Sequence, residues 1–279
     1  MNEHDVENSC GMHVVSEGPR QAPPLLLIHG SGASGGTWNP MIPALAGRHR
    51  VIRVDLPGCG QSPPAPSYEV PEQAARVAAL LDALGLEKVA VAGHSSGGYV
   101  ATALAERRPE LVGPLVLISS GPSLDALLPQ PFVIRALLAP PFGALLWRRR
   151  SDSMIRKGLV STAAGPVDIP DELVAGVQAT SYRTMREVLR QNSAYITERS
   201  VPERLAALQA PALVIFGGAD RRWDPSSARR YEAVPGARVE VLPDVGHLPL
   251  LEAPEATAGL LLDFVAADRR PPRPANRET

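Results

Sequence analysis

One short segment of the chain has the residue types and spacing of an activated serine. Gly93-His-Ser-Ser-Gly97 matches the pattern G-x-S-x-G, in which two glycines let the backbone turn sharply and leave the central serine exposed. In a chain with 24 glycines a chance match has a probability of about 0.1, so the flanking residues decide its meaning. A strand-like run at 89–92 enters the motif and a small-residue helical run at 98–105 leaves it. We therefore predict that Ser95 is a nucleophile.

A serine hydroxyl attacks poorly unless a histidine removes its proton, and a carboxylate must orient that histidine. Of the six histidines, His247 is best placed, in a loop between the last predicted strand and the last predicted helix, whereas His94 is expected to point away from Ser95. Asp220 follows a buried strand closely and completes the order serine, acid, histidine. Asp224 is the rival acid, but it directly precedes a proline, which is typical of a helix N-cap.

Acyl transfer also requires N–H donors that point at the oxyanion. We expect one donor to be the backbone N–H of Ser96 and the other to be that of Ser31, in the loop after the first long strand. The Ser31 side chain need not take part, so its replacement by alanine should cost little and by proline much. We expect Trp147, Trp223 and Leu248 to contact the substrate.

The elements that must position these residues follow from the hydrophobic pattern. Buried-strand runs occur at 25–29, 51–55, 88–92, 115–118, 212–216 and 238–242, and helical patterns occur at 70–84, 97–108, near 225–234 and at 254–267. Strands that are apolar on both faces and alternate with helices imply an α/β fold. We predict a mostly parallel sheet with helices on both faces.

The alternation of strands and helices is interrupted once. Residues 122–205 are helical in character and rich in apolar clusters, which predicts a helical insertion between two parts of one core, 1–121 and 206–268. The alternative is that this stretch forms two more core helices of a larger single domain. Residues 269–279 have no apolar anchor and are predicted to be a disordered tail.

Composition excludes several classes of partner. The chain has 28 basic and 29 acidic side chains and no basic stripe, so we expect no nucleic-acid partner. Cys10 and Cys59 cannot build a disulfide framework or a four-thiolate zinc site, and no apolar run is long enough to span a bilayer. We expect a cytoplasmic protein with no membrane partner and leave a homodimer open. We expect neither a metal nor an organic cofactor, because no ligand cluster remains outside the proposed triad.

A nucleotide-binding site is an alternative interpretation of the first glycine-rich loop. Residues 30–35 are formally G-x-G-x-x-G after a strand, and Asp55 stands roughly where a ribose-binding acid would be. The next residues include Pro40 and Pro43, which break the helix that a dinucleotide fold needs there. A dinucleotide-binding oxidoreductase is therefore a remote alternative, since it would leave His247 unexplained.

Taken together, the motifs resemble the successive signatures of the α/β-hydrolase family. They are His29-Gly-Ser-Gly32, Asp55-Leu-Pro-Gly-Cys-Gly-Gln-Ser62, the segment 93–97, Gly217-Gly-Ala-Asp220 and Gly246-His247, in that order. The resemblance covers residues 13–267 and implies a Ser-His-Asp site with residues 122–205 as a helical cap over it. We expect this chain to belong to the capped serine hydrolase or esterase-like branch of that family.

The resemblance also separates the narrower branches of that family. The segment 29–38 is similar to carbon–carbon bond hydrolases of aromatic degradation, but those usually have a tryptophan where this chain has Leu248. Epoxide hydrolases and haloalkane dehalogenases use an aspartate where this chain has Ser95, so both are disfavoured.

The expected reaction is cleavage of a carboxylic ester, thioester or lactone through an acyl-enzyme. The same residues would also support carbon–carbon cleavage, acyl transfer or perhydrolysis, and a catalytically idle ligand-binding member of the fold is a further alternative. The apolar first half of residues 122–205 favours a small-molecule substrate with an apolar acyl or ring portion, unless it forms the cap's own core. Arg148, Arg149 and Arg150 would meet an anionic group or form a solvated helix end.

Overall fold

The computed structural model describes residues 5–130, 132–208 and 210–268. The stretch 269–279, predicted from the sequence as a disordered tail, lies outside the described residues. Every helix within the described ranges is too short or too polar to cross a bilayer.

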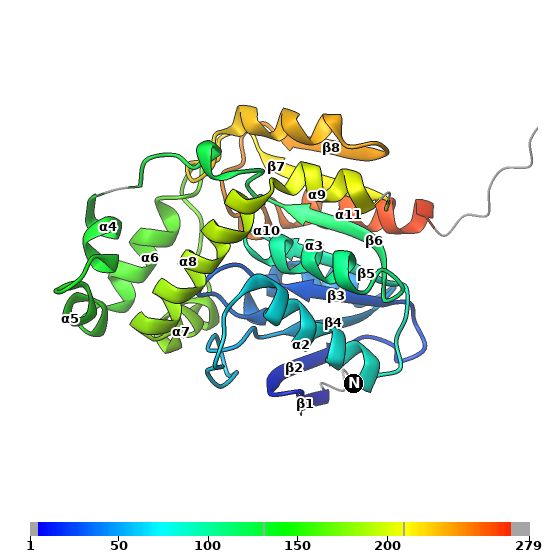
Figure 1. The fold of residues 1–279 in the computed structure, drawn as a ribbon, viewed down its shortest axis with the longest axis horizontal. Helices are drawn as coiled ribbons and strands as arrows, with labels where there is room; N and C mark the ends of the chain where they lie inside the picture. The colour runs from blue at the N-terminus through cyan, green and yellow to red at the C-terminus, as the bar shows by residue number, and fades with distance from the viewer. Residues whose placement is uncertain (1–4, 131, 209, 269–279) are drawn as a thin grey trace, which may run out of the picture.

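The centre of the molecule is an eight-stranded sheet with the strand order β1-β2-β4-β3-β5-β6-β7-β8 (Figure 1). The strands β3 to β8 pair in parallel, whereas the β1–β2 and β2–β4 pairs are antiparallel. The strands are β1 (Asp5–Ser9), β2 (Met12–Glu17), β3 (Pro24–Ile28), β4 (Arg50–Val54), β5 (Val89–His94), β6 (Val112–Ile118), β7 (Ala212–Gly217) and β8 (Ala237–Leu242). The predicted α/β fold with a mostly parallel sheet is confirmed.

Helices cover both faces of this sheet, because alternate residues of its central strands point to opposite faces. In β3, Leu26 and Ile28 pack with one group of helices while Leu25 and Leu27 pack with another. On the first face lie α2 (Val70–Ala83), α3 (Gly97–Arg107), α9 (Val201–Leu208) and the 3₁₀ helix η3 (Pro225–Ala233). On the second lie η1 (Gly35–Met41), α1 (Ile42–Leu45), α10 (Pro249–Glu252) and α11 (Pro254–Asp268).

Two parts of the sheet and one helix differ from the prediction. The β1–β2 hairpin was not predicted, because its apolar residues, among them Met12 and Val14, are interspersed with polar ones and do not form the continuous apolar run of the central strands. Strand β8 was predicted to be apolar on both faces, but it is the edge strand and none of its side chains is fully buried. The helical pattern after Pro225 forms a 3₁₀ helix instead of an α-helix.

The segment between β6 and β7 is helical and lies mainly at one side of the sheet (Figure 1). Its helices are η2 (Leu124–Ala126), α4 (Phe132–Leu138), α5 (Gly143–Arg148), α6 (Asp152–Val160), α7 (Asp171–Ala179), α8 (Tyr182–Glu198) and then α9. The end of α8 and the start of α9 join the core through Tyr195, Ile196, Val201 and Leu205. The predicted boundary after residue 205 therefore falls inside α9.

Candidate active site

Ser95 lies at a sharp turn between β5 and α3, with a backbone φ of +52°. The turn depends on its two glycines. A Cβ atom on Gly97 would lie 2.3 Å from the carbonyl oxygen of Ile28, and one on Gly93 would lie 2.4 Å from the backbone of Gly97. Real Cβ atoms do not approach so closely, so only glycine fits either position and the serine is held at the end of the strand.

The three side chains predicted to form the triad lie in one hydrogen-bonded chain. The His247 Nε2 atom is 3.1 Å from the Ser95 Oγ atom, and its Nδ1 atom is 2.9 Å from Asp220 Oδ2. All three residues are buried, with exposed fractions of 9%, 5% and 3% for Ser95, His247 and Asp220. The serine after β5 and two loops at the carboxyl ends of β7 and β8 therefore meet in one buried site.

The carboxylate of Asp220 is held from two sides. Its second oxygen, Oδ1, accepts backbone N–H bonds from Arg222 over 2.7 Å and from Trp223 over 3.1 Å. Burial opposes ionisation of this group, but the attraction of His247 and the hydrogen bonds outweigh it and hold the pKa of Asp220 below its usual value. An ionised and fixed carboxylate at Nδ1 favours the tautomer in which Nε2 can accept a proton from Ser95.

Asp224, the rival acid, has a different role. Its carboxylate accepts the backbone N–H of Ser226 over 2.9 Å and caps the N-terminus of η3, with Pro225 as the first helical residue. The predicted N-cap is confirmed, and the carboxylate bonded to His247 belongs to Asp220.

The loop that carries His247 is fixed by residues that the sequence did not reveal. Both oxygens of the Glu252 carboxylate accept backbone N–H bonds from this loop, at Gly246 and Leu248, each over 2.9 Å. The Nε2 atom of His94 is 2.9 Å from the His247 carbonyl oxygen. Burial, followed by repulsion from His247, lowers the pKa of His94 to about 3, so this ring is neutral and donates to that carbonyl. His94 is therefore bonded to the loop of the predicted base.

The two residues predicted to supply the oxyanion donors, Ser31 and Ser96, are in side-chain contact. The hydroxyls of Ser31 and Ser96 are 2.8 Å apart, and the side-chain amide of Asn192 on α8 donates to Ser31 Oγ over 3.0 Å. Within the part of the chain that the structure describes, the backbone N–H groups of Ser31 and Ser96 have no protein acceptor. Asn192 was not predicted, because it stands on a distant helix and no local pattern connects it with the site.

The His29 side chain connects the glycine-rich loop at residues 30–35 to the loop after β4. Its Nδ1 atom is 2.7 Å from the Gly30 carbonyl oxygen, and its Nε2 atom accepts the backbone N–H of Leu56 over 2.9 Å. Burial lowers the pKa of His29, which keeps this ring neutral. A neutral imidazole that donates from Nδ1 and accepts at Nε2 fits both partners.

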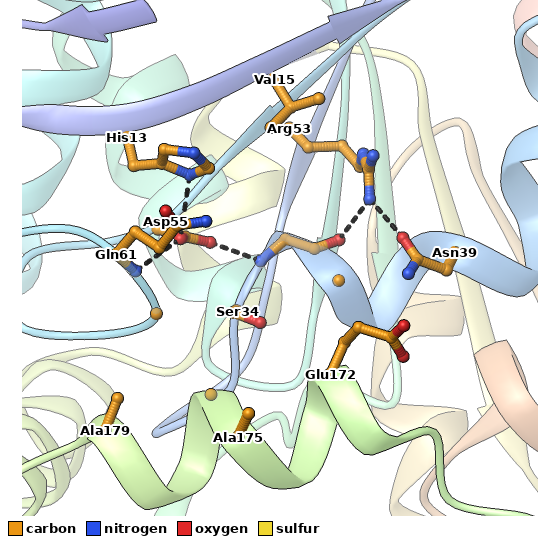
Figure 2. Close-up of a pocket in the computed structure, with 14 residues that line it drawn as sticks. His13, Val15, Ser34, Asn39, Arg53, Asp55, Gln61, Glu172, Ala175 and Ala179 are labelled. Carbon is orange, nitrogen blue, oxygen red and sulfur yellow. Dashed lines mark hydrogen bonds and ion pairs between the residues drawn. The ribbon is translucent and has the colours of Figure 1, made fainter. Parts of the chain in front are cut away.

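A cavity of about 490 Å³ lies beside this loop, and Figure 2 shows how its polar residues hold the backbone of Gly35. Asp55 accepts the Gly35 N–H over 2.7 Å and is 3.1 Å from His13 Nδ1, while Arg53 donates to the Gly35 carbonyl over 3.2 Å and to Asn39. Ser95, Asp220 and His247 do not line this cavity. Asp55 thus anchors the loop, and the ribose-binding role of the nucleotide alternative has no support here.

Trp147 packs inside the helical segment. Its indole N–H donates to the Thr180 carbonyl over 2.9 Å, and the Arg150 guanidinium lies 4.0 Å above its ring. Arg150 is buried and also donates to the carbonyls of Val177 and Gln178. For Arg150 both interpretations from the sequence are wrong, because it neither ends a helix in solvent nor is free to bind an anion.

The other two predicted substrate contacts are also packed against protein. The Trp223 ring lies so close to Gly121 that a Cβ atom there would be 2.3 Å from it. Leu248 packs with Ile155 and Leu173 of the helical segment. Substrate contact by Trp147, Trp223 and Leu248 stays a prediction.

Comparisons with a family model and with a characterised relative point to the same family. The alpha/beta hydrolase family matches residues 25–260. A pimeloyl-[acyl-carrier protein] methyl ester esterase from Aeromonas hydrophila is 31% identical over 276 residues, which cover 91% of this chain and all of that protein.

Solved structures agree with this assignment. A membrane phospholipase A, described as a bacterial virulence factor, superposes with a TM-score of 0.78 at 28% identity and covers 97% of this chain and 87% of its own. The carboxylesterase CesB (YbfK) from Bacillus subtilis gives a TM-score of 0.76 at 26% identity, with 96% and 92% covered. The chain belongs to the alpha/beta hydrolase family and is an esterase-type enzyme of that family.

Proposed function

We propose that the protein hydrolyses a carboxylic ester through a covalent acyl-enzyme formed on Ser95. The observation that carries the proposal is the buried hydrogen-bonded chain from Ser95 through His247 to Asp220, with the serine on a strained turn. The esterase names of the relatives support ester cleavage. Thioesters and lactones present the same electrophilic carbonyl and are included in the proposal.

The reaction proceeds in two halves. The Ser95 Oγ atom bonds to the ester carbonyl carbon as its proton passes to His247 Nε2, and the N–H groups of Ser31 and Ser96 bind the resulting oxyanion. Collapse of this intermediate expels the alcohol, which takes the proton from His247. A water molecule then loses its proton to His247 and attacks the acyl carbon, and the returning proton restores Ser95 as the acid leaves. Asp220 orients the imidazole and stabilises its charged form throughout.

The helical segment 122–205 is proposed to cover the site as a cap. Three of its contacts support this role, since each joins it to a part of the site. The Thr162 carbonyl accepts the His247 N–H over 3.0 Å, Asn192 donates to Ser31, and Ala164 donates to Glu252 over 2.8 Å. A lid with these anchors would exclude water from the acyl-enzyme and leave an apolar surface for the acyl group.

A fluorophosphonate probe tests the proposal, because it reacts with an activated serine. We expect stoichiometric labelling of the Ser95 peptide, no labelling of Ser95→Ala, and full labelling of the exposed control Ser226→Ala. On the best of a panel of p-nitrophenyl esters of graded chain length, Ser95→Ala should lose a factor of about 10³ or more in kcat. Wild-type kcat in Ser95→Ala, with the fold intact by circular dichroism, would overturn the mechanism.

A further inference from the structure

The helix pair α4–α5 exposes large apolar side chains to solvent. Phe132 and Phe142 are 80% and 73% exposed, and Leu145 and Leu146 are 48% and 43% exposed. These four residues are called the α4–α5 surface below. Groups of large apolar side chains on the outside of a folded chain mark an interaction site. Helices α4 and α5 lie at the end of the molecule away from the sheet (Figure 1), so the α4–α5 surface is open to a large partner.

Positive charge lies next to this surface along the chain. No acidic residue occurs between Asp125 and Asp152, while the same stretch contains four arginines. Arg150 is buried and bonded to carbonyl oxygens, but Arg135, Arg148 and Arg149 are exposed. Among the residues that the structure describes, no carboxylate pairs with these three guanidinium groups. The partner should therefore combine an apolar interior with negative charge at its surface.

The composition of this surface argues against a protein partner. Residues 131–147 contain one charged side chain, Arg135, and otherwise only the indole N–H of Trp147, which is already bonded to Thr180. A protein interface needs about one hydrogen bond per 100–200 Å², and the side chains of this segment offer no acceptor and, besides Arg135, no free donor. A second copy in a two-fold contact would bring the same arginines face to face.

An anionic lipid surface satisfies both requirements. Its phosphates attract guanidinium groups, and its acyl region accepts aromatic and aliphatic side chains. We propose that the α4–α5 surface binds the protein peripherally to anionic membranes, with Phe132 and Phe142 in the headgroup–acyl boundary and Arg135, Arg148 and Arg149 on lipid phosphates. The expectation of no membrane partner rested on the absence of a spanning segment, and a helix pair that lies in the interface needs none.

Vesicle flotation with the full chain tests this inference. We expect the protein to float with vesicles of phosphatidylcholine containing about one-third phosphatidylglycerol and to stay in the dense fraction with phosphatidylcholine alone. The variant Phe132→Ser/Phe142→Ser should reduce the bound fraction at least about tenfold. Arg148→Gln/Arg149→Gln should reduce it by about the same factor, and raising the salt concentration should do likewise.

Matched exposed residues elsewhere provide the controls. Val241→Ser on β8 and Arg229→Gln on η3 remove the same kinds of side chain and should leave flotation unchanged. Ester hydrolysis of a water-soluble substrate should be unchanged in all four variants, which shows that they fold. Failure of the wild-type chain to float, or equal loss in the controls, overturns the proposal. So does a dimer that Phe132→Ser/Phe142→Ser converts to a monomer without any vesicle binding.

Discussion

The side-chain amide of Asn192, in the second half of helix α8, donates to the hydroxyl of Ser31 over 3.0 Å, 161 residues away along the chain. The same hydroxyl is 2.8 Å from that of Ser96, the residue after the proposed nucleophile. Both proposed oxyanion donors therefore belong to residues that are tied to each other and to the helical segment. Movement of α8 would alter the spacing of the two N–H groups.

Replacing Asn192 by alanine should lower kcat about tenfold and change KM less, because a looser Ser31 loop weakens binding of the oxyanion more than binding of the substrate. The adjacent Gln191→Ala, whose side chain bonds to Glu187, is the matched control and should keep wild-type kinetics. Steady-state kinetics on a p-nitrophenyl ester measure both parameters. An equal loss in both variants would mean that α8 as a whole, and not this hydrogen bond, is responsible.

The Ser31 side chain was expected from the sequence to contribute little. The structure instead predicts that Ser31→Ala leaves the buried Asn192 amide without its partner and costs about 1–3 kcal/mol of stability. Ser31→Pro removes the N–H itself and should lower kcat about 10²-fold below that of Ser31→Ala. Urea unfolding and kinetics of both variants separate the two effects, and identical kcat values would rule out the Ser31 N–H as a donor.

The two aspartates after β7 should behave differently. Asp220→Asn should lower kcat by about 10⁴, because an amide stabilises neither the required tautomer nor the charged form of His247. Asp224→Asn keeps a good N-cap residue and should leave kcat unchanged, with a loss of stability below about 1 kcal/mol. The measurement is kcat for each variant on the same ester. A larger loss in Asp224→Asn than in Asp220→Asn would contradict the assignment of the acid.

Two glycine-to-alanine changes should have opposite effects on stability. At Gly97 the new methyl group meets the Ile28 carbonyl oxygen at 2.3 Å and should lower the free energy of unfolding by about 1–3 kcal/mol. At Gly259, inside α11, nothing other than the backbone of its own helix lies within 4 Å of the added methyl group, and alanine should raise that free energy by about 0.5–1 kcal/mol. Urea denaturation of the two variants checks both signs.

Acid should destabilise the protein partly through His94. Its pKa is about 3 in the folded state, against 6.5 for an ordinary histidine, so the unfolded chain binds an extra proton between these values. The contribution of this group to stability is complete above pH 6.5 and falls as the pH drops toward 3, by about 1.4 kcal/mol per pH unit.

The variant His94→Gln tests this account, because a glutamine amide can still donate to the His247 carbonyl but does not titrate. Its free energy of unfolding should fall less steeply than that of the wild type between pH 6.5 and 4.5. Parallel pH profiles of the two proteins would show that His94 does not carry the effect.

The sequence by itself determined the elements and the order of the reacting residues. Apolar runs, helical spacing and the glycines of the 93–97 turn act over a few residues, so they predicted β3, β4, β5, β7, α2, α3 and α11 to within about two residues, and for β6 the end of the strand but not its start. They also indicated Ser95, Asp220 and His247, because each stands at the end of a predicted strand or in the loop after one. The rival Asp224 was separated from Asp220 by the proline beside it, which is again a local signal.

Only the tertiary structure decided which distant polar groups hold that site. Asn192, Glu252 and His94 carry no local signature, and their partners were set when the helical segment and the loops packed at the end of the sheet. The exposure of β8 and the burial of Arg150 were decided in the same way. A hydrophobic pattern states that a residue must leave water, whereas the partner that satisfies a buried polar group depends on segments far apart in the chain.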